Sequence, residues 1–132
     1  MKEIKLPSGA TLKIALAPFA ESKSLYQAIL EELKFTDITP RMEVSAVFKN
    51  ISFIAFSSKK IESCVETCFK RCLYDCGKGD LKIDSQTFES AENRIDYISA
   101  YTAVIEENIT PFLSGLYVEF QRFMQRLPSV PQ

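Results

Sequence analysis

Four cysteines, each four residues after the last, constrain this chain more than any other feature. They are Cys64, Cys68, Cys72 and Cys76. The stretch 57–77 reads SSKKIESCVETCFKRCLYDCG, and its apolar residues recur at i, i+3, i+4 and i+7, which is typical of a helix with one buried face. Ser57 or Ser58 can cap its start, and Gly77 can close its end. The spacing predicts one helix over 57–77 that crosses the middle of the domain with its sulfur-rich face inward.

The same spacing invites a metal or redox interpretation, but helix geometry argues against it. Four residues of an α-helix rise about 6 Å and turn about 400°, so Cys64 and Cys76 lie about 18 Å apart along the axis and point about 120° apart. Four sulfurs around one zinc ion must each lie about 2.3 Å from it. The chain has no histidine to complete a site with two sulfurs. We expect buried free thiols and no metal.

The composition argues against several functional classes. The chain has 132 residues, which suits one domain. Its net charge is −1 and its sequence has no basic stripe of the kind that binds nucleic acid. Without histidine or a glycine-rich phosphate loop, we expect neither an enzyme nor a cofactor. No apolar run reaches the roughly 18 residues of a membrane span. The start, MKEIKLPSGA, has no signal-peptide core, so we expect a protein of the reducing cytosol.

The N-terminal pattern predicts a β-hairpin. Polar and apolar residues alternate over 3–6 and 11–16, on either side of turn-forming residues 7–10. A lone hairpin is marginal in water, so its apolar face must pack on helices. The residues that need this cover are Leu6, Leu12, Ile14 and Leu16. Residues 81–84 are a candidate third strand.

The rest of the chain favours helices, which gives an α+β fold that is mostly helical, with the hairpin packed on a bundle of about five helices. The expected ranges are 20–34, 41–56, 57–77, 90–107 and 112–127. Residues 51–56 are rich in aromatic and β-branched side chains and alternatively form a strand. Thr110-Pro111 restarts or kinks the chain before the last helix. One globular domain over 1–127 and a disordered tail over 128–132 are expected.

The last helix has the clearest apolar stripe. A stripe of this kind either belongs to the core or binds an amphipathic helix of a partner, and the apolar segment 41–56 offers the same two alternatives. The residues that we select as candidates for partner binding are Phe112, Leu116, Phe120, Phe123 and Met124.

Three stretches together resemble the tail assembly chaperones of long-tailed, siphovirus-type bacteriophages and prophages of Gram-positive hosts. They are KLPSGATLKIALAPF, SSKKIESCVETCFKRCLYD and FESAENRIDYISAYTAVIEENITPFLSGL. The resemblance covers about residues 4 to 117 and rests on pattern and order. The four cysteines and the lack of tryptophan are not features of that family.

The resemblance implies a non-enzymatic factor for virion morphogenesis in the host cytoplasm. Such chaperones bind the long, helical, aggregation-prone tape measure protein and keep it soluble while tail tube protein polymerises around it. Self-association of the chaperone into a homo-oligomer is a further expectation. Two alternatives stay open: a structural head–tail or tail component of the phage, and a thiol- or metal-dependent regulatory protein that uses the cysteine helix.

Overall fold

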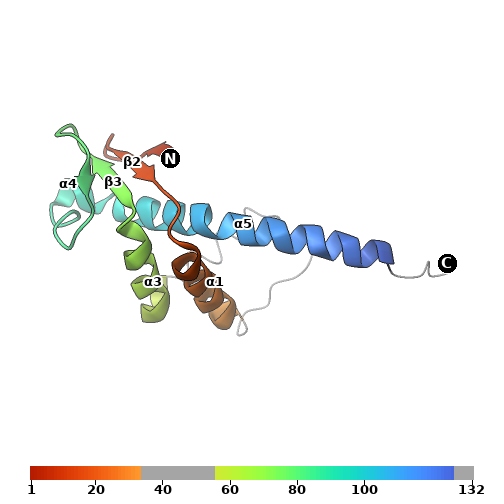
Figure 1. Ribbon diagram of the computed structural model, residues 1–132. Coiled ribbons are helices and arrows are strands. Elements are labelled where there is room, and N and C mark those ends of the chain that lie inside the picture. Colours follow the sequence, from red (N-terminus) through yellow and green to blue (C-terminus); the bar gives the residue numbers. More distant parts are fainter. Residues whose placement is uncertain (34–55, 127–132) are drawn as a thin grey trace.

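The computed structural model describes residues 1–33 and 56–126 of the chain (Figure 1). The predicted helix over 41–56 lies outside the described residues apart from Phe56, and the predicted tail over 128–132 lies wholly outside them. The elements in chain order are β1 (Lys2–Lys5), β2 (Thr11–Ile14), α1 (Phe19–Leu33), α3 (Lys59–Phe69), β3 (Cys72–Asp75), β4 (Leu81–Lys82), α4 (Ala91–Arg94) and α5 (Tyr97–Arg126).

The predicted N-terminal hairpin is confirmed and forms half of a larger sheet. The four strands are antiparallel in the order β1-β2-β3-β4. Gly9 adopts a φ of 93° in the β1–β2 turn, a conformation that favours glycine. The candidate strand near 81–84 exists as β4, but it pairs with β3 and not with the hairpin. The sheet therefore has four strands because β3, unforeseen from the sequence, joins the two parts.

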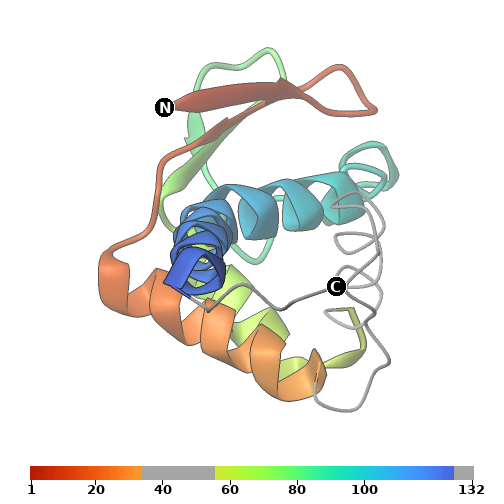
Figure 2. The same ribbon diagram turned by 90° about the vertical axis from the view of Figure 1, so that its right-hand side faces the viewer.

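The first half of α5 is the centre of the domain. Figure 2 shows the sheet on one side of α5 and the pair α1 and α3 on the other. Side chains from all three layers meet in one core. Its largest fully buried apolar or aromatic members are Tyr74, Tyr101, Leu12, Ile14, Leu25, Ile29, Ile61, Ile105, Ile109, Val65 and Val104.

The prediction of one cysteine helix over 57–77 is wrong in its second half. Helix α3 begins after its N-cap Ser58 and ends at Phe69, and residues 72–75 form strand β3 beside β2. Cys72 and Tyr74 are buried while Leu73 and Asp75 are only partly so, which is the two-residue alternation of a strand. The four-residue spacing hid this alternation, because a cysteine at position 72 fits the inward face of either structure.

The predicted five-helix bundle is also wrong. Within residues 1–33 and 56–126 there are three long helices, α1, α3 and α5, and the single turn α4. Pro111 lies inside α5, which continues for 30 residues instead of stopping there. Figure 2 shows the first turns of α5 at an angle to the rest, so the helix bends, as an interior proline causes. The helix predicted over 90–107 is divided into α4 and the start of α5, and Ile95 and Ile98 at this junction are exposed.

The hairpin packs on helices as expected, with one exception. Leu6, Leu12 and Ile14 are buried, whereas Leu16 is exposed. Leu16 lies two residues beyond the end of β2, where the chain leaves the sheet toward α1. The alternation therefore stops being a guide to burial once the strand ends.

One buried carboxylate joins the hairpin turn to the start of α5. Asp96 is fully buried and accepts hydrogen bonds from the Ser8 backbone N–H at 2.9 Å, the Ser8 hydroxyl at 2.5 Å and the Tyr74 hydroxyl at 2.7 Å. Burial, with the hydrogen bond to Asp96, raises the pKa of the Tyr74 hydroxyl to about 12. These three bonds give both oxygens of the buried carboxylate a hydrogen-bond partner.

Candidate functional site

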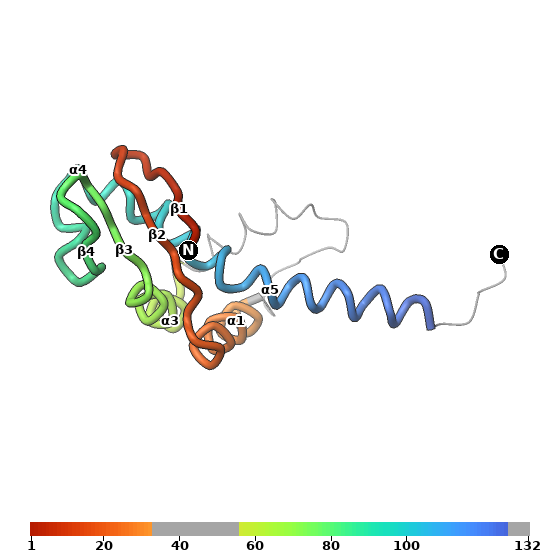
Figure 3. Tube along the Cα trace, turned by 45° about the horizontal axis from the view of Figure 1, so that its top comes forward, coloured from red at the N-terminus to blue at the C-terminus, as the bar shows by residue number. Residues whose placement is uncertain are grey.

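Helix α5 divides into a buried half and an exposed half. In the first half Ala100, Tyr101, Val104, Ile105 and Ile109 are buried. Every residue from 114 to 126 is exposed. Figure 3 shows this second half extending away from the folded body. The chain thus presents an apolar helical surface that the described part of the domain leaves uncovered.

The candidate residues from the sequence fall on that exposed half. The exposed fraction is 59% for Leu116, 58% for Phe120, 57% for Phe123 and 52% for Met124. Phe112 is half-buried and stacks on Tyr26, with the two ring centroids 5.0 Å apart. The structure therefore brings four of the five residues together on one open face and places the fifth where that face meets the body.

Sequence reasoning missed one member of this face. Tyr117 is 62% exposed, and its hydroxyl accepts a hydrogen bond from the Gln121 amide at 2.9 Å. At about 100° per residue, Tyr117 falls within an arc of about 120° that also contains Leu116, Phe120, Phe123 and Met124. The signal was its spacing of three residues from Phe120. We call this surface the distal stripe, formed by Leu116, Tyr117, Phe120, Phe123 and Met124.

A hollow lies at the base of the distal stripe. It has a volume of about 360 Å³ and is lined by Leu16, Ala17, Phe19, Ser22, Asn108, Pro111 and Phe112. Leu16 and Phe19 are exposed at its rim, and the Phe19 ring lies 5.9 Å from the Phe112 ring. Most of the lining is apolar, so the hollow suits an apolar side chain of a bound helix.

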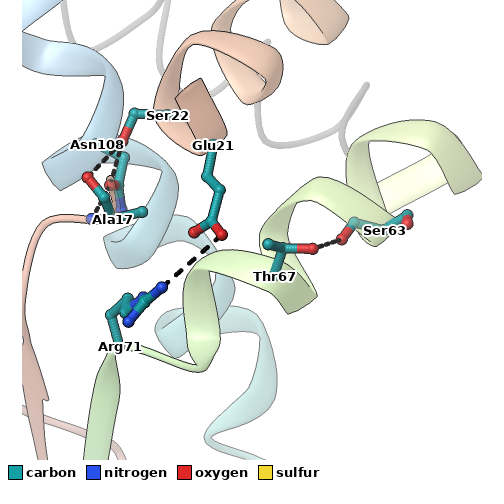
Figure 4. A network of polar contacts seen from close by, with 7 residues as sticks. All are labelled: Ala17, Glu21, Ser22, Ser63, Thr67, Arg71 and Asn108. Carbon is teal, nitrogen blue, oxygen red and sulfur yellow. Dashed lines mark hydrogen bonds and ion pairs between the residues drawn. The ribbon is translucent and has the colours of Figure 1, made fainter. Parts of the chain in front are cut away.

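A buried amide fixes the position of this hollow. Figure 4 shows the Asn108 side chain accepting hydrogen bonds from the Ala17 backbone N–H at 3.0 Å and the Ser22 hydroxyl at 2.9 Å. Its own amide nitrogen donates to the Val104 carbonyl at 2.9 Å. Asn108 is buried, so these bonds hold the β2–α1 connection against α5 without competition from water.

An ion pair adds a weaker tie on the far side of α1. The Glu21 carboxylate lies 3.9 Å from the Arg71 guanidinium, which joins α1 to the connection between α3 and β3 (Figure 4). Both side chains are partly exposed, and such pairs contribute little to stability. Packing and the Asn108 bonds, more than surface charge, therefore position the hollow.

A second hollow has a different character. It has a volume of about 370 Å³ and lies between the end of α3 and the segment after β4. Aromatic side chains line it together with four charged ones, namely Glu66, Lys70, Asp84 and Glu89. This charged rim fits an apolar helix less well than the hollow beside Phe112 does.

The cysteines show no shared site. Cys68 and Cys72 are buried, Cys64 is partly buried and Cys76 is exposed. Among the described residues, no group of three or more histidine, cysteine, aspartate or glutamate side chains is placed to hold a metal ion. Burial raises the pKa of the Cys68 thiol to about 12 and that of the Cys72 thiol to about 11. Both thiols are thus held in the neutral form, which is neither nucleophilic nor metal-binding.

The thiols should differ in reactivity in the order of their exposure. With a thiol-specific chromogenic reagent, Cys76 should react at once, while Cys68 and Cys72 should react only as the domain unfolds, because their thiolates do not form in the core. Replacing Cys68 and Cys72 by alanine should cost about 1–3 kcal/mol of unfolding free energy. Stoichiometric zinc in the purified protein, lost together with the fold in this variant, would contradict the assignment.

Comparisons with known proteins add no relative. No protein-family model matches the chain, and no curated protein or solved structure matches it either. In the part of the chain that the structure describes, no helix combines the length and the apolar character needed to cross a membrane. The function must therefore be argued from the geometry of the chain itself.

Proposed function

We propose that this protein is a tail assembly chaperone that binds and solubilises a tape measure protein in the host cytoplasm, with the distal stripe as its binding surface. The observation that carries the proposal is the exposure of the stripe. Five large apolar side chains on one face of a helix are more than half exposed. A helix of a monomer that faced only water would gain nothing from such a face.

The shape of the surface supports a helical client. The distal stripe follows the helical spacing that packs against another helix, and the hollow beside Phe112 can seat a side chain at one end of it. The stripe itself contains no charged residue, and its charged neighbours Glu119 and Arg122 pair with each other at 3.1 Å. Apolar packing therefore supplies the attraction, and it tolerates many client sequences along a long helical protein.

The proposed role also fits weak, repeated binding. A chaperone that covers a long client must occupy many similar sites and must leave each of them when tube subunits arrive. A short, open, apolar face gives contacts of modest strength, since binding must also offset the loss of rotational freedom. Such a surface suits a transient holder of helices better than a permanent structural subunit.

The central test is co-expression with the tape measure protein encoded by the same phage. The wild-type chain should raise the soluble yield of that protein several-fold, and the variant Phe120→Ser with Phe123→Ser should abolish the increase. Because both rings are exposed, the circular dichroism spectrum and the melting temperature of the free variant should stay close to wild type.

A matched control uses the same chemistry elsewhere on the surface. Ile95 and Ile98 are 58% and 61% exposed, close to the values of Phe120 and Phe123, but they lie near the opposite end of α5. Ile95→Ser with Ile98→Ser should keep the rescue. If both double variants lost the rescue to the same extent, general surface hydrophobicity, and not the distal stripe, would be responsible for client binding. If the wild-type chain did not rescue its client, the chaperone proposal would be rejected. Mass spectrometry of purified virions should find this protein absent, whereas a structural head–tail or tail component would be present.

A further inference from the structure

The charges beside the distal stripe are arranged unevenly. At about 100° per residue, Glu119 and Arg126 fall on one flank of the stripe, and Ser114, Gln121 and Gln125 fall on the other. One flank thus carries an acidic and a basic side chain seven residues apart, and the other carries only neutral polar groups. This asymmetry distinguishes between the ways in which two such helices can pair.

We propose that the distal half of α5 pairs with the same segment of a second copy of this chain, antiparallel, about a two-fold axis near Arg122. In an antiparallel pair of helices like flanks face each other, whereas in a parallel pair unlike flanks do. Glu119 already pairs with Arg122 of its own helix at 3.1 Å, and only the antiparallel arrangement also places it beside Arg126 of the other copy. The two-fold axis makes both contacts at once, since each copy offers the same pair of charges.

The spacing of the stripe supports this pairing. Leu116, Phe120 and Phe123 are separated by four and three residues, and Leu127 continues the same alternation in the sequence. That alternation is the seam of a coiled coil, in which knobs of one helix enter holes of the other. Tyr117 and Met124 flank the seam and widen the apolar contact.

The position of the folded body also favours the antiparallel arrangement. Figure 1 shows the sheet, α1 and α3 gathered at one end of α5, with the second half of the helix extending beyond them. Antiparallel pairing places the two bodies at opposite ends of the joined helices. Parallel pairing brings both bodies to the same end, where they compete for space.

The contact between the two copies is small. Each copy offers five side chains that are more than half exposed, and large side chains of this kind each bury on the order of 100 Å² more when covered, so the pair buries on the order of 1,000 Å². This lies near the lower end of specific protein interfaces. Interfaces of this size are typical of transient complexes, so we expect pairing in the micromolar range that covers the stripe until a helical client displaces the second copy.

The experiment is a charge-swap cycle followed by sedimentation equilibrium of the purified full chain. Glu119→Arg alone and Arg126→Glu alone each place like charges opposite one another twice per dimer, and each should raise the dissociation constant about tenfold or more. The variant with both changes restores opposite charges and should return the constant to near the wild-type value. Glu92→Arg, the same charge change at an exposed site on α4, should leave it unchanged.

The outcomes separate the alternatives. A wild-type chain that stays monomeric across the micromolar range overturns the proposal, and so do single swaps without effect or a double swap without recovery. The tape measure rescue is measured separately, so a monomeric chaperone that still rescues its client would overturn the pairing and leave the proposed function standing.

Discussion

Replacing Leu12 by aspartate should unfold the domain at room temperature. Leu12 is 0% exposed and lies in β2 between Ile4 of β1 and Tyr74 of β3. An unpaired carboxylate there either stays charged in an apolar core or binds a proton at a high cost, and the loss of several kcal/mol is comparable to the whole stability of a small domain. Circular dichroism during urea and thermal unfolding measures the effect.

A second strand position provides the control. Leu81 begins β4 at the edge of the sheet and is exposed. Leu81→Asp should change the unfolding free energy by less than about 1 kcal/mol, because the charge stays in water. If Leu12→Asp melted within a few degrees of wild type, the packing of the hairpin on α5 would be wrong.

Replacing Asp96 by alanine should cost about 3–5 kcal/mol. The change leaves the buried Tyr74 hydroxyl without its acceptor, which costs about 1–3 kcal/mol, and it also removes the two hydrogen bonds that the exposed Ser8 donates to the carboxylate. It also detaches the β1–β2 turn from the start of α5. Thermal unfolding of the variant, measured against Glu92→Ala as an exposed acidic control, tests this.

Two further variants separate the bonds from the charge. Asp96→Asn keeps one oxygen acceptor and should lose less stability than alanine does. Tyr74→Phe removes only the hydroxyl and should lower the unfolding free energy by about 1–3 kcal/mol, which is less than Asp96→Ala does. Equal stability of Asp96→Ala and the wild type would show that the three bonds contribute nothing net, and that the hairpin is held by apolar packing alone.

The candidate site could be predicted in part because its pattern is local. The spacing of Phe112, Leu116, Phe120 and Phe123 identifies a helix with one apolar face whatever surrounds it. Whether such a face is core or surface depends on how far the neighbouring layers extend. The sheet, α1 and α3 cover α5 only to about Leu113, and the exposed half follows from that. The hollow beside Phe112 was unpredictable, because its walls come from residues about 90 positions apart.

The sequence by itself determined the elements whose hydrogen bonds and apolar faces are set by near neighbours: the N-terminal hairpin, α1, the first half of the cysteine segment and a helix through the last stripe. Only the tertiary structure decided the fate of residues 72–75, since the partner that makes them a strand is β2, about 60 residues earlier. It also decided that Pro111 bends α5 without ending it: packing holds the turns before the proline, and the helix continues beyond it to Arg126. Strand pairing and burial depend on contacts between distant segments, and a local pattern can suggest those contacts but cannot choose among them.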